Sequence, residues 1–463
     1  MVYNIALADR LREQLSGTAG LTEKKMFSGI GYIVCALLLA AGVLRAQSFD
    51  AQLGIRLQTT LDSLRAALDM KGVSAAVLIP GEGLWLGTSG YSHADVPVTP
   101  GMEFGIGSNS KLFTAVTLLK LAENDILSLE DSLHKWLPAY TNIDSHITIR
   151  QLLNHTSGIE DVNVIPGYAD SILSNPQRVF TRDEVIRWTG PPRFPAGTSW
   201  SYSNTNYLLA GMIVERASGR PFVSLLRESL LAPLQLDDTF LPVEDTIHGN
   251  IAHPWLSNVD IDSVPRVSLL SAAWAAGAMY STAGDMARWY DALMSGRVLR
   301  PESFKQMTTF VGSGNYGFGL TEKTVSGRLM WVHSGLIRGY TSQMFYDTTL
   351  KAVICVLVNA MPASASFIAQ QLLLILVNSS NTAIAELPLP ETSVQVFPNP
   401  SSDLIHISTP GERLRDVELF NLFGTRVRTH FTPEFSTASL PRGIYFIRVR
   451  TERSSVIQRI VLR

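Results

Sequence analysis

The segment Phe104-Gly105-Ile106-Gly107-Ser108-Asn109-Ser110-Lys111 places a serine and a lysine three residues apart at the start of a helix expected over residues 108–124. Side chains at positions i and i+3 share one helix face, so the Lys111 amine stands beside the Ser108 hydroxyl. A serine needs a base to act as a nucleophile, and a lysine can be that base only when its pKa is lowered. Gly105 and Gly107 permit a tight turn from strand to helix. The segment predicts a nucleophilic Ser108 with Lys111 as its base.

The Ser-x-x-Lys spacing is not specific by itself, because Ser132-Leu133-His134-Lys135 repeats it. We interpret that copy as a chance occurrence on a surface helix. A second candidate element, Tyr202-Ser203-Asn204, follows a loop rich in Pro, Gly and Ser, where a phenol can project into a cleft. The alternative is a buried tyrosine that caps the following helix, expected over residues 206–217.

A third candidate element, His333-Ser334-Gly335, follows an apolar strand expected over residues 329–332. A strand edge beside a nucleophile can supply a backbone N–H to an oxyanion, and glycine permits close substrate approach. The alternative is a histidine at a strand end before a turn.

These three elements, in this order, resemble motifs of the serine β-lactamase and DD-peptidase superfamily, for which a related motif set is known. The version here is similar to that of class C β-lactamases, D-alanyl-D-alanine carboxypeptidases and related esterases. The resemblance covers residues 52–380. Further matching segments are Leu112 to Ala115 after the lysine, Leu152 to Ile159 around His155-Thr156-Ser157-Gly158, Ala276 to Ala287, and Tyr316-Gly317-Phe318-Gly319.

The resemblance implies catalytic roles for three side chains. Ser108 is the acylated nucleophile, Lys111 its base or proton relay, and Tyr202 a shuttle for a proton to or from the leaving group. Asn204 binds the substrate amide, and His155 shapes the cleft rather than reacting.

The resemblance also implies a substrate-binding edge. His333 and Ser334 flank the carboxylate or acyl side of the substrate, Gly335 lets it approach, and the backbone N–H groups of Ser108 and Leu336 form an oxyanion hole. Many β-lactamases have a lysine where this chain has His333. If His333 binds an acidic substrate, catalytic efficiency is expected to fall as pH rises through the histidine titration.

The order of the expected elements indicates an α+β fold. An amphipathic helix over 51–70 and strands over 73–79 and 84–88 come first, a helix-rich middle spans 125–300, and strands over 329–332, 343–346 and 352–358 precede a closing helix over 367–377. The first and last segments are expected to share one sheet beside a helical lobe, as in a β-lactamase/DD-peptidase-like fold with an antiparallel sheet flanked by helices.

The C-terminal part has a different pattern. A linker is expected over 381–393, and short β-type runs over 394–463 predict a small all-β sandwich. Val396-Phe397-Pro398-Asn399-Pro400, the run from Leu419 to Gly424 and Gly443-Ile444-Tyr445 resemble the C-terminal sorting domain of type IX secretion in Bacteroidetes-type bacteria. The alternative is an ordinary β-sandwich interaction module.

The N-terminal segment contains a candidate targeting signal. Lys24 and Lys25 precede an apolar run over 27–44, which resembles a secretory signal peptide. Residues 1–46 are therefore expected to be an N-terminal extension and signal peptide, and residues 47–380 the hydrolase domain. An uncleaved membrane anchor is the alternative reading.

The composition argues against a nucleic-acid-binding protein and against a disulfide framework. The chain has 463 residues with a formal net charge of −2, which argues against a nucleic acid as the main partner. Of its two cysteines, Cys35 lies in the expected signal peptide, so Cys355 remains without a disulfide partner. No metal or cofactor is expected.

The sequence therefore predicts a secreted or surface-attached serine hydrolase that acts through a covalent acyl-enzyme on an amide or ester. Its expected partners are a small-molecule or peptide substrate and the type IX secretion machinery. The candidate substrates are D-amino-acid peptides, β-lactams and small esters. A non-catalytic penicillin-binding or sensor protein on the same fold and a surface adhesin are the alternatives.

Overall fold

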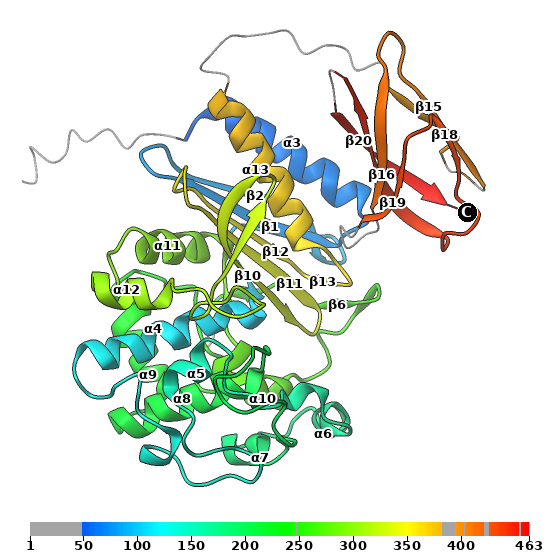
Figure 1. Cartoon of the computed structure of the whole chain (residues 1–463). Helices are drawn as coiled ribbons and strands as arrows, with labels where there is room; N and C mark the ends of the chain where they lie inside the picture. The colour runs from blue at the N-terminus through cyan, green and yellow to red at the C-terminus, as the bar shows by residue number, and fades with distance from the viewer. Residues whose placement is uncertain are drawn as a thin grey trace, which may run out of the picture. The chain divides into compact units, whose positions relative to one another are not determined.

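The computed structural model describes residues 49–246, 248–381, 394–399, 401, 403–420, 426–452 and 455–462. Residues 49–381 contain a seven-stranded sheet in which every neighbouring pair is antiparallel (Figure 1). In spatial order its strands are β3 (Val96–Pro97), β2 (Gly83–His93), β1 (Gly72–Ile79), β12 (Val353–Val358), β11 (Tyr340–Asp347), β10 (Arg328–Ile337) and β9 (Thr321–Val325).

The pairing of β1 with β12 joins the first and last segments of this part of the chain. It confirms that they share one sheet, and the α+β class is also confirmed. Both central strands are buried along most of their length, which explains why their sequences are continuous apolar runs rather than alternating ones.

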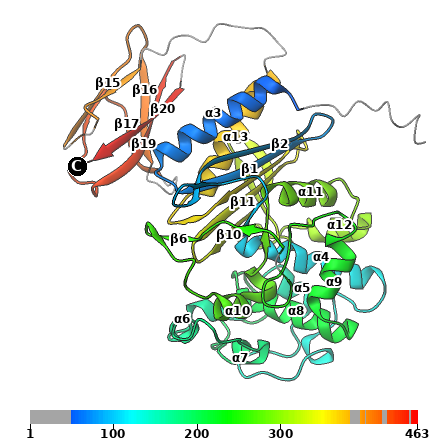
Figure 2. The ribbon, with the colours of Figure 1, turned by 180° about the vertical axis from the view of Figure 1, so that it is seen from behind.

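Two helices cover one face of the sheet: α3 (Ala51–Ala67) and α13 (Ala365–Asn381) (Figures 1 and 2). The α3 helix begins where the Asp50 carboxylate accepts a hydrogen bond from the Leu53 backbone N–H at 2.6 Å. Its buried residues Leu53, Leu57 and Leu61 recur at helical spacing and pack on the sheet.

The opposite face carries α11 (Ala283–Met294) and the helical lobe. The α4 helix of that lobe is buried on nearly every side, so its apolar residues surround the axis instead of forming one stripe. The helices of the lobe are α4 (Ser110–Glu123), α5 (Ile149–Leu153), α6 (Tyr168–Leu173), α7 (Arg182–Ile186), α8 (Asn204–Ser218), α9 (Phe222–Leu226), α10 (Val267–Gly277) and α12 (Pro301–Met307), with short turns η1 (Gly107–Asn109), η2 (Leu133–Lys135), η3 (Val162–Val164) and η4 (Arg227–Leu231).

Short strands connect the lobe to the sheet. They are β4 (Met102–Gly105), β5 (Asn250–Ile251), β6 (Trp255–Leu256), β7 (Val259–Asp260), β8 (Tyr280–Ser281) and β13 (Ala360–Met361). The β4 strand leads directly into the turn that carries Ser108, and its pairing with β8 fixes where that turn begins.

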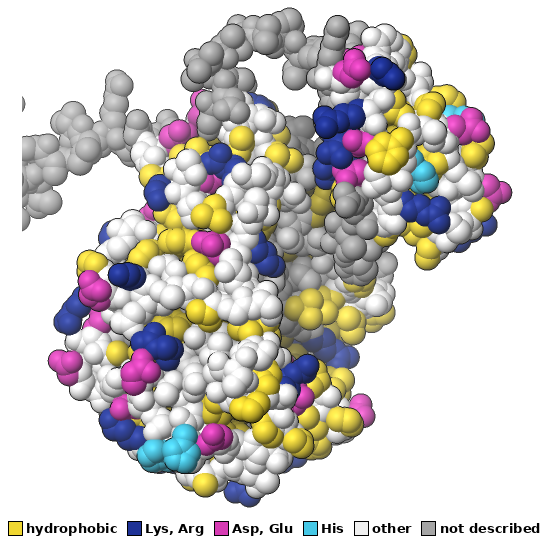
Figure 3. Space-filling view, in the orientation of Figure 1, with side chains coloured by type: hydrophobic (Ala, Val, Ile, Leu, Met, Phe, Trp, Pro, Cys, Tyr) yellow, Lys and Arg dark blue, Asp and Glu magenta, His cyan; other side chains and the backbone are white. Residues whose placement is uncertain are grey.

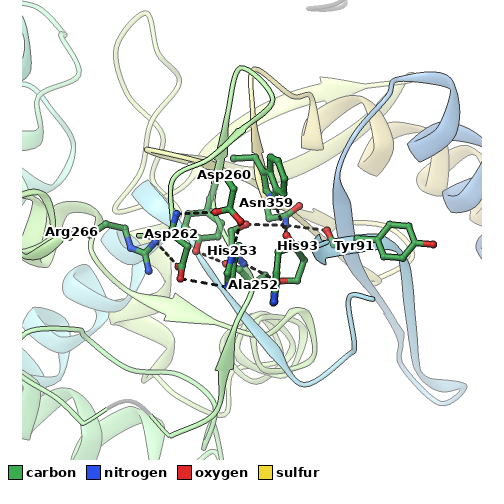
Figure 4. Close-up of polar contacts among 11 residues, drawn as sticks. Tyr91, His93, Ala252, His253, Asp260, Asp262, Arg266 and Asn359 are labelled. Carbon is green, nitrogen blue, oxygen red and sulfur yellow. Dashed lines mark hydrogen bonds and ion pairs between the residues drawn. The ribbon is translucent and has the colours of Figure 1, made fainter. Parts of the chain in front are cut away.

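A polar cluster around His253 ties the 250–262 segment to the sheet (Figure 4). The His253 ring stacks on His93 with ring centroids 3.6 Å apart, and its Nδ1 lies 2.8 Å from a carboxylate oxygen of Asp260. The Asn359 amide donates to backbone carbonyls of Tyr91, Ser92 and His253. The cluster thereby holds the ends of β2 and β12 against this segment.

The structure differs from the sequence expectations in three places near the candidate site. The β10 strand continues to Ile337, so His333 lies within it rather than after it. Ser108 lies in the 3₁₀ turn η1 before α4, and α8 begins at Asn204.

The free end of β10 is pressed against the turn that carries Ser108. The β9 strand pairs with β10 only as far as Val332, so the remainder of β10 is an open edge. A Cβ at Gly335 would lie 1.9 Å from the Ile106 carbonyl oxygen, and one at Gly107, whose φ is +54°, would lie 2.4 Å from the Leu336 nitrogen. Both glycines are required for this approach.

The C-terminal module has two sheets around its own apolar core, which includes Ile405, Val417, Ile447 and Ile460. The pattern of short strands predicted from the sequence is confirmed, and β18 is an additional strand. The strands are β14 (Gln395–Phe397), β15 (Leu404–Ser408) and β18 (Glu434–Ser436) in one sheet, and β17 (Arg426–His430), β16 (Leu414–Phe420), β19 (Gly443–Thr451) and β20 (Ser455–Leu462) in the other.

The expected signal peptide and most of the expected linker lie outside the described residues. Within the described part of the chain, no helix has the length and apolar character needed to cross a membrane. On the face shown in Figure 3, basic and acidic side chains are interspersed, in agreement with the nearly balanced net charge.

The buried side chain of Glu103 in β4 allows a test of how the chain packs around this strand. Its side chain is fully buried, neither carboxylate oxygen has a hydrogen-bond partner among the described residues, and burial raises its pKa from 4.5 to about 7, with further contributions from Asp238 and Asp285. A carboxyl whose pKa is raised on folding holds its proton in the native state while the unfolded chain loses it. The free energy of unfolding should therefore fall as pH rises from 4.5 to about 7.

We expect Glu103→Gln to flatten this decline and to be more stable than wild type at pH 8. Urea unfolding at pH 5 and pH 8 measures the difference, and the exposed Glu302→Gln is the matched control. Parallel pH profiles for wild type and Glu103→Gln would contradict the assignment.

Candidate active site

The turn that carries Ser108 is held by hydrogen bonds on both sides. The Ser110 hydroxyl donates to the Gly107 carbonyl at 2.7 Å and accepts from the Met279 N–H at 3.1 Å. The Asn109 amide donates to the Ser342 hydroxyl of β11 at 2.8 Å, and that hydroxyl donates to the Ile106 carbonyl. The turn is thus bonded to both the lobe and the sheet, which fixes the Ser108 side chain at their junction.

Lys111 lies one turn after Ser108 and is fully buried. Its Nζ lies 3.0 Å from the Ser108 Oγ, 2.6 Å from the Asn204 Oδ1 and 2.6 Å from the Ala276 carbonyl oxygen. Burial lowers the pKa of this amine from 10.5 to about 7, and the Asp161 carboxylate partly opposes that effect. A substantial fraction of Lys111 is therefore neutral near neutral pH.

The three contacts determine which way a neutral Lys111 amine points. Two of its partners, the Asn204 Oδ1 and the Ala276 carbonyl, can only accept hydrogen bonds. They take the two N–H bonds of the neutral amine, so its lone pair faces the third partner, the Ser108 hydroxyl. This arrangement can remove the proton from Ser108.

Asn204 is oriented by a residue that sequence reasoning missed. Its Nδ2 donates to the Asp161 Oδ2 at 2.8 Å, which directs its Oδ1 toward Lys111. Both polar atoms of the amide are thus engaged, and the expected contact of Asn204 with a substrate amide stays a prediction. Asp161 follows the segment from Leu152 to Ile159 by two residues, but no spacing rule links it to Asn204.

Tyr202 faces Ser108 from the loop before α8. Tyr202 and Ser108 line the same cleft, and the Lys111 Nζ lies 4.9 Å from the centroid of the Tyr202 ring. Burial raises the pKa of this phenol above its usual value. Tyr202 therefore holds its proton at neutral pH and can donate it to an atom bound beside Ser108.

His333 is buried, and both ring nitrogens are engaged. Its Nδ1 donates to the Ser334 carbonyl at 2.8 Å, so its Nε2 is the acceptor for the Tyr316 hydroxyl, also at 2.8 Å. Burial, with the charge of Lys111, lowers the pKa of His333 from 6.5 to about 3. The ring is neutral at neutral pH, so the expected titration of His333 in that range is wrong.

His155 lies behind Tyr202 within a group of aromatic rings. Its Nδ1 accepts hydrogen bonds from the Ser203 N–H at 3.3 Å and the Asn206 amide at 3.0 Å. Its ring centroid lies 4.5 Å from that of Tyr202 and 4.5 Å from that of Tyr316. Burial lowers its pKa well below the usual value, so it supports the wall of the site as an uncharged ring.

An open cleft of about 890 Å³ meets the Ser108 side chain. That volume lies within the range of small-molecule sites. Lys111 and Asn204 lie behind the nucleophile and are not part of the cleft wall. The remaining expected site residues form its lining: Ser108, Tyr202, His333, Ser334, Gly335 and Leu336.

The copy of the motif at Ser132 has none of this geometry. The Lys135 amine is half exposed and forms an ion pair with Asp131 at 2.8 Å, and the Ser132 hydroxyl contacts His134. Its interpretation as a surface coincidence is confirmed. Among the described residues, no group of His, Cys, Asp and Glu side chains is arranged to hold a metal ion.

Comparison with known families gives two matches along the chain. The profile of the family described as Beta-lactamase matches residues 57–377. The profile described as the secretion system C-terminal sorting domain matches residues 395–463.

The chain is also similar to individual curated proteins. It is 26% identical to penicillin-binding protein 4* of Bacillus subtilis (strain 168) over 315 residues, which cover 62% of this chain and 68% of that protein. It is 26% identical to the D-aminopeptidase of Gluconobacter oxydans (strain 621H) over 326 residues, which cover 69% of this chain and 61% of that protein. The chain thus spans less than two thirds of the D-aminopeptidase.

Two solved structures have the same architecture over their whole length. A D-stereospecific amidohydrolase from Streptomyces sp. has a TM-score of 0.60 and 30% identity, with 68% of this chain and 97% of that one covered. The D-amino acid amidase from Ochrobactrum anthropi SV3, complexed with L-phenylalanine amide, has a TM-score of 0.62 and 28% identity, with 71% of this chain and 100% of that one covered.

The lowered pKa of Lys111 predicts the pH dependence of Ser108 reactivity. The rate of acylation should rise with pH as Lys111 loses its proton and should level off above an apparent pKa of about 7. Because Asp161 raises the Lys111 pKa, Asp161→Asn should move this limb to lower pH. Labelling of Ser108 by a fluorophosphonate probe between pH 5 and 9 measures both, with the exposed Asp170→Asn as control. If the rising part of the pH profile of labelling has the same midpoint in Asp161→Asn as in wild type, the assignment is contradicted.

Proposed function

Because the chain belongs to the Beta-lactamase family of serine hydrolases and carries a secretion system sorting domain, we propose that it is an exported hydrolase that cleaves an amide or ester through a covalent acyl-enzyme on Ser108. The observation that carries this proposal is the contact between the buried Lys111 amine and the Ser108 hydroxyl. A fold alone does not establish an activity, so the argument rests on this site.

Acylation begins when neutral Lys111 takes the Ser108 proton. The Ser108 oxygen then bonds to the substrate carbonyl carbon, and the negative charge of the tetrahedral intermediate lies between the backbone N–H groups of Ser108 and Leu336. Loss of one such donor typically costs about 10²–10³ in rate. The close approach of Gly107 to the Leu336 nitrogen supports this pairing of donors.

Collapse of the intermediate breaks the bond to the leaving group. Tyr202 donates its phenolic proton to the leaving nitrogen or oxygen, and the Lys111 ammonium returns a proton to Tyr202. The serine proton has then moved to the leaving group. In deacylation a water molecule takes the place of the leaving group, and the same groups act in reverse.

The relatives support a proposal for the substrate class at a coarse level. They include proteins described as a D-aminopeptidase, a D-amino acid amidase and a D-stereospecific amidohydrolase. We therefore propose an amide or ester of a D-amino acid as the substrate, with β-lactams as a further acylating class. The neutral His333 gives no positive charge at the position where many β-lactamases have a lysine, which favours peptides and esters over β-lactams.

Export fits the two-part organisation of the chain. We propose that residues 47–380 form the catalytic domain and that residues 394–463 direct it to secretion or the cell surface, after passage through the periplasm with a cleaved signal peptide. The match to the sorting domain supports this assignment.

Intact-mass spectrometry tests the catalytic proposal. Wild type mixed with benzylpenicillin, or with the ester of an N-acylated D-amino acid, should gain the mass of the acyl group, and Ser108→Ala should gain none. Ser132→Ala, which removes the serine of the coincidental copy, should behave like wild type. Equal adducts on wild type and Ser108→Ala would exclude Ser108 as the nucleophile.

Turnover separates the enzyme from a non-catalytic penicillin-binding or sensor protein. An adduct on the ester that decays while acid is released supports a hydrolase. A permanent stoichiometric adduct with every ester and amide of this class would support the sensor.

A further inference from the structure

The cleft does not end at the nucleophile but crosses the open edge of β10. Along this strand Gly335 faces the Ile106 carbonyl before the Ser108 turn and His333 faces Tyr316, whereas Val332 faces the apolar core beneath α3 and α13. The cleft is lined by residues of both faces. Residues on the α13 side of its wall are Val332, Ser334, Leu336, Thr341, Gln343 and Phe345.

Lys323 lies in the half of the cleft on the α13 side. It is opposite Met330 in the pairing of β9 with β10, and directly opposed residues of antiparallel strands point to the same face. Met330 belongs to the core beneath α13, so Lys323 points to that side as well. Its side chain is exposed, and it forms no ion pair within the described residues.

The charge of the cleft wall has one sign. Among the described residues that form the wall, Lys323 is the one lysine or arginine, and no aspartate or glutamate is present. His333 is neutral, so Lys323 is the source of formal positive charge on this wall. The charge of Lys323 contributes to the lowered pKa of His333. A substrate carboxylate finds a cation here, whereas a substrate ammonium finds no counter-ion.

Two further features of the same region can donate hydrogen bonds. The first turn of the 17-residue helix α13 lines the cleft at Ala365 and Ser366, and helix N-termini attract negative charge. The Thr341 side chain is only 6% exposed, and its hydroxyl has no hydrogen-bond partner among the described residues although Thr341 lines the cleft. A buried hydroxyl left unpaired is costly, and a bound acceptor would remove that cost.

In the proposed mechanism the leaving group lies beside Tyr202, next to the edge of β10. Tyr202, which donates a proton to the leaving group in the mechanism above, has its ring centroid 6.5 Å from that of His333 on the edge of β10. A leaving group that continues past His333 therefore reaches the strand edge and then the Lys323 side.

We propose that the α13 side of the cleft binds a carboxylate on the leaving group of the substrate, and that Lys323 is the residue that selects for it. The inference rests on the proposed hydrolase function and narrows it to substrates whose released part ends in a carboxylate, such as D-amino-acid peptides with a free C-terminus. Substrates whose nearest charge is an ammonium group are disfavoured.

A matched pair of substrates tests this selection. One is an N-acylated D-alanyl ester whose leaving group ends in a carboxylate, and the other has that carboxylate replaced by a carboxamide. Wild type should have a higher kcat/KM for the acid, and Lys323→Gln should lower that value about three- to tenfold while leaving the carboxamide unchanged, as for a partly solvated ion pair. The preference of wild type for the acid should also shrink as salt is raised.

Two control variants separate charge from structure. Lys323→Arg should keep most of the preference for the acid, and Lys305→Gln, which removes an exposed lysine of α12, should leave both rates unchanged. The inference is overturned if Lys323→Gln lowers both rates equally or changes neither. Hydrolysis of both substrates with no preference would overturn it while the proposed function stands. If wild type hydrolyses neither substrate nor any other ester of this class, the proposed function fails and this inference fails with it.

Discussion

The site depends on the burial of one amine. Lys111 is surrounded by the Ser108 hydroxyl, the Asn204 amide oxygen and the Ala276 carbonyl, so it has hydrogen-bond partners but no directly contacting carboxylate. Removal from water disfavours its charged form, and the acceptors hold it in one orientation. A paired carboxylate in place of Asn204 would keep the amine protonated and leave Ser108 without a base. Asp161 stands one residue further away, where it orients Asn204 with a weaker effect on the charge of Lys111.

The architecture brings these groups together from distant parts of the chain. The sheet, made from the first and last segments, supplies the open edge of β10, and the lobe inserted between them supplies Tyr202, Asn204 and Ala276. The turn after β4 is bonded to both, through Asn109 to β11 and through Ser110 to the segment after α10. The same open edge lets the cleft reach the far face of the sheet, where the charge of Lys323 is placed.

Short-range sequence patterns predicted those features of the structure that depend on residues close together in the chain. Ser108 and Lys111 are neighbours because of helix geometry, and the strands and helices of both modules follow from apolar periodicity. The charge state of His333 was not predictable in this way, because it depends on burial and on Tyr316, which approaches from a separate loop. Asp161 and Lys323 were missed for the same reason: both lie within a few residues of a motif segment, but their roles follow from tertiary packing and from strand register, which no spacing rule reveals.

Direct titration of the Lys111 side chain tests the central claim. In protein labelled with ¹³C at the lysine Cε, the Lys111 signal is assigned by its loss in Lys111→Arg and followed by NMR from pH 5 to pH 11. The account predicts a midpoint near 7 for Lys111, while exposed lysines titrate near ~10.4. A Lys111 signal that titrates together with the exposed lysines would show an amine that stays charged at neutral pH, and would contradict its role as the base for Ser108.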